Sequence, residues 1–308
     1  MQKLKHLISA TQFADRKLLE ELFLSALRME RDDVQRTLRL SLSGRILATI
    51  FYEPSTRTRL SFEAAMQKLG GGILTAENAR ENSSAAKGES IADAIRVIGG
   101  YADVIVMRHY EEGTAKAAAE ISPVPLINAG DGPGEHPTQA LVDIYTIGKE
   151  QGRVEGLRIA LVGDLLYGRT IHSLLQLLCL YPGVSIDLIS PDNLRLPAKY
   201  IEMIKQKGVS LRESNTLSDS IEHADVVYIT RVQRERFSDI REYEAIKDSY
   251  FVDKEIAERM KQSSILMHAL PRVNEISPEV DADPRAAYFR QAKNGLYVRM
   301  ALLEHLLS

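Results

Sequence analysis

The chain contains 308 residues, 44% of them hydrophobic, which is enough to bury one large core or two smaller ones. Its formal net charge of −3 argues against non-specific binding to nucleic acid. No apolar run approaches the roughly 18 residues of a membrane span, and the first residues lack the pattern of a cleavable leader. The single Cys179 cannot form an intrachain disulfide, as is usual in a reducing compartment. We therefore expect a soluble, cytoplasmic protein with no nucleic-acid or membrane partner.

Apolar runs of strand length recur along the chain and alternate with segments of helical periodicity. The apolar runs span residues 45–51, 102–108, 124–129, 158–164, 184–190, 224–230 and 263–269. Helical segments between several of them span residues 55–69, 138–150, 169–180 and 196–207. This alternation predicts an α/β fold of parallel sheets with helices on both faces.

The segment 129–137 (AGDGPGEHP) is the richest in Gly and Pro, and we expect it to be a hinge between two halves. We predict two doubly wound parallel-sheet domains, one of residues 1–137 with 293–308 and one of residues 138–292. The last helix, around 295–307, is amphipathic and is expected to pack back on the first domain.

Five consecutive residues, Ser55 to Arg59, combine three hydroxyls with two guanidinium groups where an apolar run ends and a helix begins. The first turn of a helix leaves backbone N–H groups unpaired and carries a partial positive charge, so it binds phosphate readily. A lone Ser here would indicate a helix cap, and a lone Arg a solvated charge. Their combination in one turn favours a site for an oxyanion.

Further Arg, His, Gln and hydroxyl side chains follow the other apolar runs. They are Arg108 and His109, His136 and Gln139, Arg169 and Thr170, Arg231 and Gln233, and His268 with Arg272. Parallel sheets bind ligands beyond the carboxyl ends of their strands, so these side chains should gather at one edge of each sheet. Like charges ~4 Å apart repel by ~4 kcal/mol at an effective dielectric constant of 20. The arginines therefore imply anionic substrates that carry phosphate, carboxylate or both.

The segment 163–170 (GDLLYGRT) nearly matches the phosphate loop of nucleotide hydrolases. However, Arg169 replaces the lysine, the interior lacks the glycines that let a backbone wrap phosphate, and the run 224–230 lacks a terminal metal-binding Asp. The glycine pattern of dinucleotide-binding folds is missing too, and no spacing of Cys, His or carboxylates resembles a metal site. We therefore expect neither a cofactor nor a metal.

Seven segments spread over nearly the whole chain carry a family resemblance. They are FYEPSTRTRLSFE at 51–63, KGES at 87–90, VMRH at 106–109, NAGDGPGEHPTQALVDIYTI at 128–147, VGDLLYGRTIHSL at 162–174, TRVQRER at 230–236 and HALPRVNEI at 268–276. Together they resemble the carbamoyltransferase family. TRVQRER and PRVNEI resemble the members that use aspartate, and the Cys-Leu-Pro and Ser-Met-Gly segments typical of ornithine enzymes do not occur.

The resemblance implies transfer of the carbamoyl group of carbamoyl phosphate to the α-amine of aspartate, for pyrimidine synthesis. The carbamoyl-phosphate site that it implies consists of Ser55, Thr56, Arg57, Thr58, Ser83, Lys87, Arg108, His136 and Gln139. Arg57 would stabilise the leaving phosphate. Thr58, Arg108 and His136 would face the carbonyl oxygen, where negative charge builds as the amine attacks. These four residues are the implied catalytic groups.

The second substrate accounts for the remaining arginines. The aspartate site implied by the resemblance consists of Lys87, Arg169, Arg231, Gln233 and Leu270. Arg169 would bind the α-carboxylate, and Arg231 with Gln233 the side-chain carboxylate, because the planar fork of Arg pairs a carboxylate in two places. The Leu270 carbonyl and the Gln139 side chain would hold the carbamoyl NH2.

The polar segment 78–89 (NARENSSAAKGE) has no strong periodicity and is expected to be a loop. The resemblance implies that this loop, with Ser83 and Lys87, reaches a neighbouring subunit's site, so the implied assembly is a homotrimer with shared sites. Glu53 matches a residue that bridges the two domains through Arg169 and the region of Arg236. An exposed loop carboxylate is the alternative for Glu53. Regulatory chains and allosteric regulation are left open.

Two positions depart from the family pattern, and three other functions stay open. Ala269 stands where most aspartate enzymes have Pro, which leaves the backbone rigidity and a cis peptide there undecided. Leu166 stands where Lys is frequent. The alternatives are a carbamoyltransferase for another amine such as ornithine, a two-lobed anion-binding protein without turnover, and a nucleotide hydrolase using the 163–170 segment.

Overall fold

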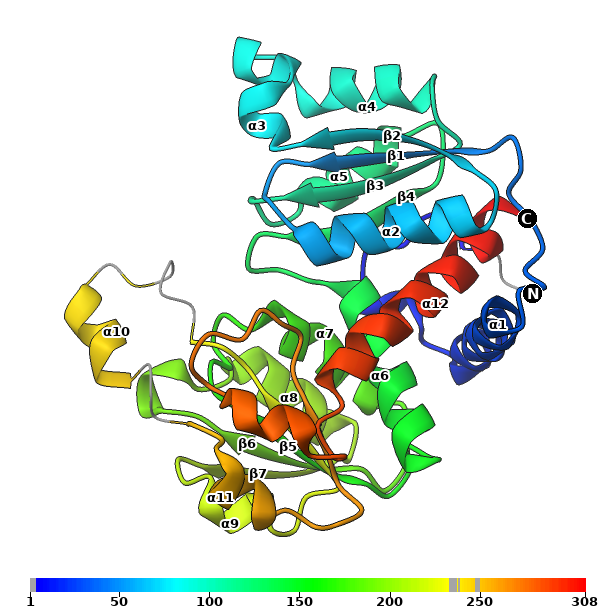
Figure 1. Cartoon of the computed structure of the whole chain (residues 1–308). Coiled ribbons are helices and arrows are strands. Elements are labelled where there is room, and N and C mark those ends of the chain that lie inside the picture. Colours follow the sequence, from blue (N-terminus) through cyan, green and yellow to red (C-terminus); the bar gives the residue numbers. More distant parts are fainter. Residues whose placement is uncertain (1–3, 233–236, 238, 247–249) are drawn as a thin grey trace. The chain divides into compact units, whose positions relative to one another are not determined.

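The computed structural model describes residues 4–232, 237, 239–246 and 250–308. The chain divides into two compact units, Met1–Val142 with Lys293–Ser308, and Asp143–Ala292. Each unit has a parallel sheet with helices packed on it (Figure 1). Within the described ranges, no helix is long and apolar enough to cross a membrane.

The sheet of the first unit has four parallel strands in the order β2-β1-β3-β4. The strands are β1 (Ile46–Phe51), β2 (Gly72–Glu77), β3 (Val104–His109) and β4 (Leu126–Asp131). The helices are α1 (Arg16–Val34), α2 (Thr56–Lys68), α3 (Ala79–Asn82), α4 (Ile91–Gly99) and α5 (Thr114–Ile121), with 3-10 turns at Ala10–Gln12 and Ser84–Lys87. A core cluster that includes Ile50, Ile105 and Leu126 lies on this sheet.

The sheet of the second unit has five parallel strands in the order β7-β6-β5-β8-β9. The strands are β5 (Arg158–Val162), β6 (Ser185–Ile189), β7 (Ser210–Ser214), β8 (Val226–Ile229) and β9 (Ile265–Met267). The helices are α7 (Arg169–Leu178), α8 (Ala198–Gln206), α9 (Ser218–Ile221), α10 (Ile240–Ile246) and α11 (Lys254–Glu258), with 3-10 turns at Asp192–Leu194 and Pro278–Ala282. Helices α6 (Pro137–Gln151) and α12 (Tyr288–Leu307) contribute residues to both units.

The predicted α/β class with two parallel sheets is confirmed, and each of the seven apolar runs contains a strand. Two strands were not predicted, β2 and β7, each of which is one of the two edge strands of its sheet. The other edge strands, β4 and β9, are buried and overlap predicted apolar runs. The side chains of β2 and β7 alternate between partly buried and exposed rather than forming a buried run. An edge strand pairs on one side only and needs less apolar surface, so its sequence carries a weaker signal.

The Gly- and Pro-rich segment 129–137, expected to be a hinge, lies within the first unit. Asp131 braces it, because Oδ1 accepts hydrogen bonds from Asn128 Nδ2 and the Glu135 amide at 3.1 Å each. The Asp131 Oδ2 atom accepts a third bond from the Gly113 amide at 3.0 Å. The division between the compact units falls after Val142, inside helix α6.

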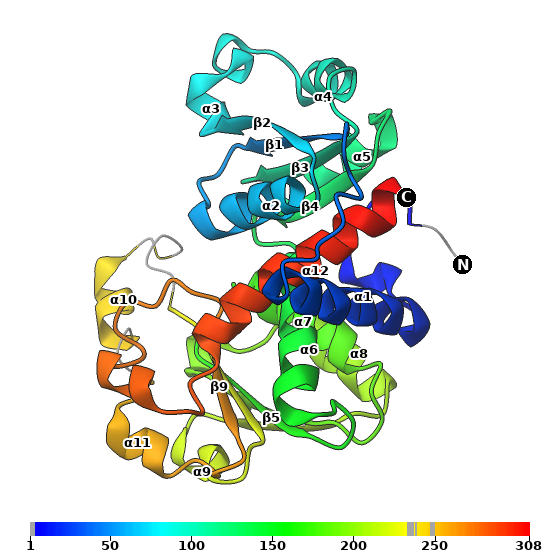
Figure 2. The ribbon, with the colours of Figure 1, turned by 45° about the vertical axis from the view of Figure 1, so that its right-hand side comes forward.

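The predicted return of the C-terminal helix to the first unit is confirmed. Helix α12 begins at Tyr288, about two turns before the predicted start, and its C-terminal part lies beside α1 (Figure 2). The Tyr297 hydroxyl donates to Asp33 of α1 at 3.2 Å, and the Arg299 guanidinium lies 5.1 Å from the centre of the Phe62 ring. These contacts join the two ends of the chain in one unit.

Gly163, directly after β5, is the glycine at which a side chain would be most costly. Its φ is +109°, and an added Cβ would overlap with the Thr230 carbonyl beyond β8. We expect Gly163→Ala to lower the free energy of unfolding by about 2–4 kcal/mol, from backbone strain and overpacking together. Urea unfolding followed by circular dichroism measures this.

Gly208→Ala is the matched control, because Gly208 also has a positive φ, +70°, but has open space where Cβ would stand. It should cost only about 1 kcal/mol. If both variants lost the same free energy of unfolding, the close approach of Thr230 to Gly163 could not be the cause of the larger loss expected for Gly163→Ala.

Candidate active site

The strand order reverses once in each sheet, and several of the predicted site residues lie at the ends of the strands at those points. In the first sheet β1 lies between β2 and β3, and Phe51 at the end of β1 is in register with Arg108 of β3. In the second sheet β5 lies between β6 and β8, and Val162 is in register with Ile229. The crevice beyond the carboxyl ends of strands at such a switch point is where open α/β sheets bind ligands.

The first turn of α2 follows β1 at this point of the first sheet. Ser55 occupies the N-cap position with extended backbone, but its side chain makes no capping hydrogen bond. The alternative interpretation, in which the Ser55 hydroxyl only caps the helix, is therefore wrong. Thr56 and Arg57 are exposed, whereas Thr58 is buried. Unpaired N–H groups and hydroxyls thus meet at one helix terminus, as oxyanion binding requires.

The Arg57 guanidinium has no ion-pair or hydrogen-bond partner among the residues that the structure describes. Loss of hydration by partial burial lowers its pKa below the ordinary value of arginine. A positive charge that is partly dehydrated and unpaired is stabilised by a bound anion. Arg57 is therefore the arginine of this turn that is available for a ligand.

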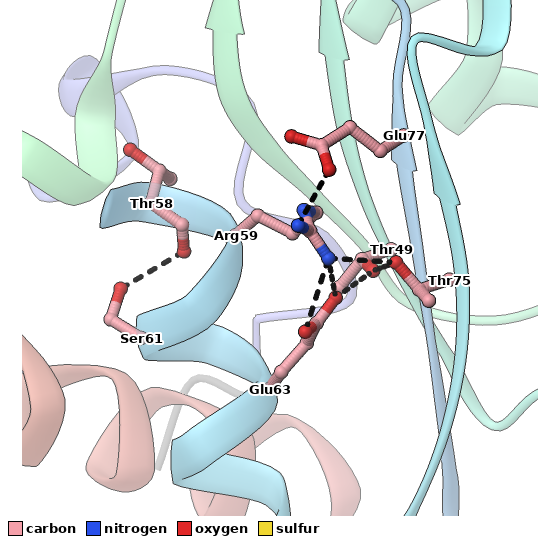
Figure 3. A network of polar contacts seen from close by, with 7 residues as sticks. All are labelled: Thr49, Thr58, Arg59, Ser61, Glu63, Thr75 and Glu77. Carbon is pink, nitrogen blue, oxygen red and sulfur yellow. Dashed lines mark hydrogen bonds and ion pairs between the residues drawn. The ribbon is translucent and has the colours of Figure 1, made fainter. Parts of the chain in front are cut away.

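Arg59, the second arginine of the turn and not one of the predicted site residues, is paired within the fold. Its Nη1 donates to Glu63 at 3.1 Å and to Thr75 at 3.3 Å, and its Nη2 donates to Glu77 at 2.7 Å (Figure 3). The side chain is only 15% exposed. Glu63, four residues after Arg59 in the same helix, is the sequence signal that could have revealed this pairing.

The Arg59 contacts belong to a polar network that fixes α2 on the sheet. The Thr49 hydroxyl of β1 donates to Glu63 at 2.9 Å and lies 3.1 Å from the hydroxyl of Thr75 in β2 (Figure 3). Two strands and one helix are thereby joined by side chains, and the low exposure of Thr49, Arg59 and Glu63 makes that part of the network rigid. It sets the position of the N-terminal turn of α2 before any ligand arrives.

Arg108 is held by Glu53 within the same unit. Its Nε donates to Glu53 Oε2 at 2.9 Å, and the two side chains are 13% and 31% exposed. The Tyr52 amide donates to the Arg108 carbonyl at 2.9 Å, which fixes the loop after β1 against the end of β3. This pairing, which was not predicted, gives Glu53 a role inside the first unit. The expected bridge through Arg169 and the region of Arg236 stays a prediction, and Arg236 lies outside the described residues.

His136 and Gln139 stand at the start of α6. The His136 carbonyl accepts hydrogen bonds from the amides of Gln139 and Ala140 at 3.0 and 3.2 Å, so its backbone caps the helix. Its ring is buried, and Nδ1 lies 3.2 Å from the Thr138 hydroxyl. This contact fixes the ring orientation. The His136 backbone therefore has a structural role at the start of α6, and a buried, oriented imidazole is present in addition.

The segment 78–89, expected to be a loop, contains the two short helical turns α3 and Ser84–Lys87. The Ser83 hydroxyl joins them, because it donates to the Ala79 carbonyl and accepts from the Ala85 amide at 3.1 Å. Lys87 is exposed at the end of the second turn. Ser83 therefore shapes the segment, while the ammonium group of Lys87 is presented at its surface.

In the second unit, Arg169 is the first residue of α7, directly after the turn that follows β5. The turn is held by buried Asp164, which accepts from the Tyr167 amide at 2.9 Å, and by His172, whose Nε2 lies 2.9 Å from the Leu165 carbonyl. Burial lowers the pKa of His172 to about 4, so it stays neutral at pH 7. The turn after β5 is thus held by the side chains of Asp164 and His172. It differs in this from the phosphate loop of nucleotide hydrolases, whose backbone wraps the phosphate.

Arg231 follows β8, the strand beside β5, and is half-buried. Arg169 and Arg231 therefore come from the two strands between which the second sheet reverses its order. Gln233, the expected neighbour of Arg231 in the aspartate site, lies outside the described residues.

Two further members of the predicted strand-end set have structural roles instead. Arg272 pairs with Asp281 through both terminal nitrogens and donates to the Tyr288 hydroxyl at 3.0 Å. The His109 ring is 3% exposed and accepts from the Glu111 amide at 3.1 Å. Neither side chain is presented to a ligand, and sequence position alone could not distinguish them from the others.

Leu270 lies in a sharp turn beyond β9. Its φ is +52°, and the bond between Leu270 and Pro271 is cis, which answers the question raised by the Ala269 substitution. The Leu270 side chain packs against the core of the second unit. Over residues 4–232, 237, 239–246 and 250–308, no group of three or more His, Cys, Asp or Glu side chains could hold a metal ion.

Taken unit by unit, the geometry defines an α/β protein whose two sheets each present cationic side chains at the switch point. Comparison with family models is consistent with this. The model described as "Aspartate/ornithine carbamoyltransferase, carbamoyl-P binding domain" matches residues 5–149, and the model described as "Aspartate/ornithine carbamoyltransferase, Asp/Orn binding domain" matches residues 155–306. The chain belongs to the aspartate/ornithine carbamoyltransferase family.

Individual relatives agree with the aspartate branch. The chain is 52% identical to a chloroplastic aspartate carbamoyltransferase of Arabidopsis thaliana, covering 99% of this chain and 78% of that protein. It is 51% identical to the aspartate carbamoyltransferase catalytic subunit of Methanocaldococcus jannaschii, covering 99% and 98%.

Solved structures give the same assignment. A structure of the M. jannaschii catalytic subunit has a TM-score of 0.92 at 50% identity and covers 99% of this chain and 98% of that one. The Trypanosoma cruzi aspartate transcarbamoylase in complex with carbamoyl phosphate and aspartate has a TM-score of 0.94 at 41% identity and covers 99% and 98%.

The different surroundings of Arg57 and Arg59 predict that their removal affects stability to different extents. Arg59→Ala leaves Glu63, a partly buried carboxylate, without its cation and should lower the free energy of unfolding by about 1–3 kcal/mol. Arg57→Ala removes a guanidinium without a partner in the described chain and should change stability by less than about 0.5 kcal/mol. Urea unfolding of the two variants without ligand measures the difference, and a larger loss for Arg57→Ala would refute the assignment.

Proposed function

We propose that the chain transfers the carbamoyl group of carbamoyl phosphate to the α-amine of L-aspartate, giving N-carbamoyl-L-aspartate and phosphate. The observation that carries the proposal is the distribution of cationic side chains. In the first unit, Arg57, which has no partner among the described residues, stands on a helix N-terminus beside the strand that carries Arg108. In the second unit, Arg169 and Arg231 follow the two strands at the switch point. One phosphate and two carboxylates match these groups in charge.

The first unit would bind carbamoyl phosphate. Its phosphate would lie on the first turn of α2, held by the amides and hydroxyls of Ser55, Thr56 and Thr58. Arg57 would neutralise the charge that develops on the bridging oxygen as phosphate leaves. Ser83 and Lys87 would complete the phosphate contacts. The corresponding domain assignment is residues 1–137 with 293–308.

The carbonyl oxygen of carbamoyl phosphate would be polarised by Thr58, Arg108 and His136. The Glu53 carboxylate holds Arg108 through Nε, which leaves the guanidinium in a fixed plane. The buried ring of His136 is likewise fixed through Nδ1. Donors that are already oriented need no reorganisation as the oxyanion forms, which is the main source of such stabilisation.

The second unit, assigned as residues 138–292, would bind aspartate. Arg169 would pair with the α-carboxylate, and Arg231 with Gln233 would pair with the side-chain carboxylate. Lys87 would also approach aspartate. The carbamoyl NH2 would donate to the Gln139 side chain and to backbone carbonyls at Ala269 and Leu270. No covalent intermediate is required, and the departing phosphate would accept the amine proton.

We also propose a cytoplasmic homotrimer in which the segment 78–89 of one chain supplies Lys87 to a neighbouring site. The exposure of Lys87 at the end of its short turn supports this. Regulatory chains, as the name "catalytic subunit" of the M. jannaschii relative suggests for that protein, would be additional partners.

The test of function is carbamoyl transfer by the purified chain, with aspartate and ornithine offered in parallel. Product is expected from aspartate only. Arg57→Ala should lower kcat by about 10²–10³, the usual effect of losing one donor to the developing charge. Arg231→Ala should instead raise the KM for aspartate, because it removes a contact to the substrate's own carboxylate.

The alternatives predict other outcomes of the same assay. Product from ornithine would overturn the role of Arg231 and leave the phosphate site intact. Binding of carbamoyl phosphate without product from either amine would favour an anion-binding protein.

Shared sites predict complementation between two defective chains. Lys87→Ala and His136→Ala should each be inactive alone, whereas trimers refolded from a mixture should regain part of the wild-type activity. The reason is that some sites then combine an intact Lys87 with an intact His136. Mixtures of Lys87→Ala with Arg108→Ala serve as a second pair, and absence of recovery in both would exclude action in trans.

A further inference from the structure

His268 and Glu275 form a buried pair for which the proposed reaction gives no direct role. Their side chains are 3% and 5% exposed, and His268 Nε2 lies 2.7 Å from Glu275 Oε1. Titratable groups at this depth lose their hydration and need hydrogen bonds in exchange. The partners that supply those bonds show what the pair holds in place.

The contacts of the pair define which imidazole nitrogen carries the proton. The Leu270 amide donates to His268 Nδ1 at 2.8 Å. Since a backbone N–H can only donate, Nδ1 is the unprotonated nitrogen and Nε2 carries the proton toward Glu275. The carboxylate therefore selects the tautomer that can accept from Leu270.

Glu275 is in turn oriented by the backbone of the same segment. Its Oε2 accepts from the amides of Val273 and Asn274 at 3.1 Å each. Burial alone raises the pKa of Glu275, but the interaction with His268 and the amides of Val273 and of Glu275 itself outweigh it and lower the pKa. The segment from 268 to 275 is thus closed on itself through one ionised carboxylate.

This closure fixes the direction of a backbone carbonyl. The peptide between Ala269 and Leu270 is trans, so its N–H and C=O point in opposite directions. With the N–H held on the imidazole, the Ala269 carbonyl faces away from His268. Among the described residues, no group donates to the carbonyls of Ala269 or Leu270. Both acceptors are available to a ligand.

A second chain of buried groups holds the start of the segment. The His268 amide donates to Gln291 at 3.0 Å, and Gln291 donates to Asp143 at 2.7 Å. The Tyr228 hydroxyl donates to the other oxygen of Asp143 at 3.0 Å. Because these three side chains are almost fully buried, they anchor the backbone of His268 while its ring orients the peptide that follows.

We propose that His268 and Glu275 are positioning residues that aim the carbonyls of Ala269 and Leu270 at the carbamoyl NH2. The inference rests on the proposed carbamoyl transfer and adds to it a device that sets the orientation of the planar carbamoyl group. A planar group held by its NH2 presents its carbon to the amine at a fixed angle, which is the kind of alignment that raises kcat.

Two substitutions of His268 test whether its ring orients the peptide between Ala269 and Leu270 or only fills space. In His268→Asn, Oδ1 stands near the place of Nδ1 and can accept from Leu270. In His268→Gln, the amide reaches toward Glu275 but offers no acceptor at the Nδ1 place. We expect kcat for His268→Gln to be about 10-fold or more below that of His268→Asn. The KM for aspartate should agree within about twofold, because the aspartate carboxylates are bound elsewhere.

Glu275→Gln tests the choice of tautomer. A Gln amide that donates to Nε2 would shift the imidazole proton to Nδ1, where it opposes the Leu270 amide, so kcat should fall as in His268→Gln. The ¹⁵N spectrum of histidine-labelled wild-type protein reports the tautomer directly and depends on no variant. Unprotonated Nδ1 is expected, and a protonated Nδ1 would overturn the inference.

The outcomes separate this inference from the function on which it rests. Absence of carbamoyl transfer by the wild-type chain would refute the function. An active wild type, with equal kcat for His268→Asn and His268→Gln, would refute only the positioning role.

Discussion

The reversal of strand order within each parallel sheet is the constraint on which the candidate site depends. The chain passes from β1 to β2 on one side and then returns to β3 on the other side of β1, so the carboxyl ends of β1 and β3 stay uncovered by these connections. The in-register pair Phe51 and Arg108 brings the α2 terminus and the guanidinium to the same level. The second sheet repeats this arrangement at β5 and β8, which gives each unit its own cationic edge.

The arginine side chains near these edges have two different roles. Some stabilise the fold through carboxylate partners, and others are presented to substrate. Arg59 and Arg272 have carboxylate partners and low exposure, and they stabilise the elements next to the site. Arg57 has lost hydration without gaining a partner among the described residues. Two helical positions only two residues apart therefore play opposite roles, because their side chains point about 200° apart and only Arg59 faces the sheet.

The sequence predicted the central strands well and the surroundings of single side chains poorly. Strands such as β1 and β3 are buried on both faces, so their apolar runs are unambiguous, whereas the edge strands β2 and β7 carry mixed residues. The division between units lies inside α6, where helical periodicity continues and no turn signal exists. The difference between Arg57 and Arg59 depends on Glu77, a residue 18 positions away from Arg59 that only the tertiary fold brings near.

Ala269 lacks the ring constraint that a proline would supply, and a hydrogen bond restricts the neighbouring backbone instead. A proline at this position would restrict φ through its ring, whereas alanine leaves that torsion free. Here the bond from the Leu270 amide to the imidazole fixes the following peptide, and Glu275 fixes the imidazole. The two constraints differ in one respect, since a pyrrolidine ring is permanent while the imidazole acts only in one tautomer. Orientation of the carbonyls in this chain is therefore tied to the tautomer of a buried imidazole.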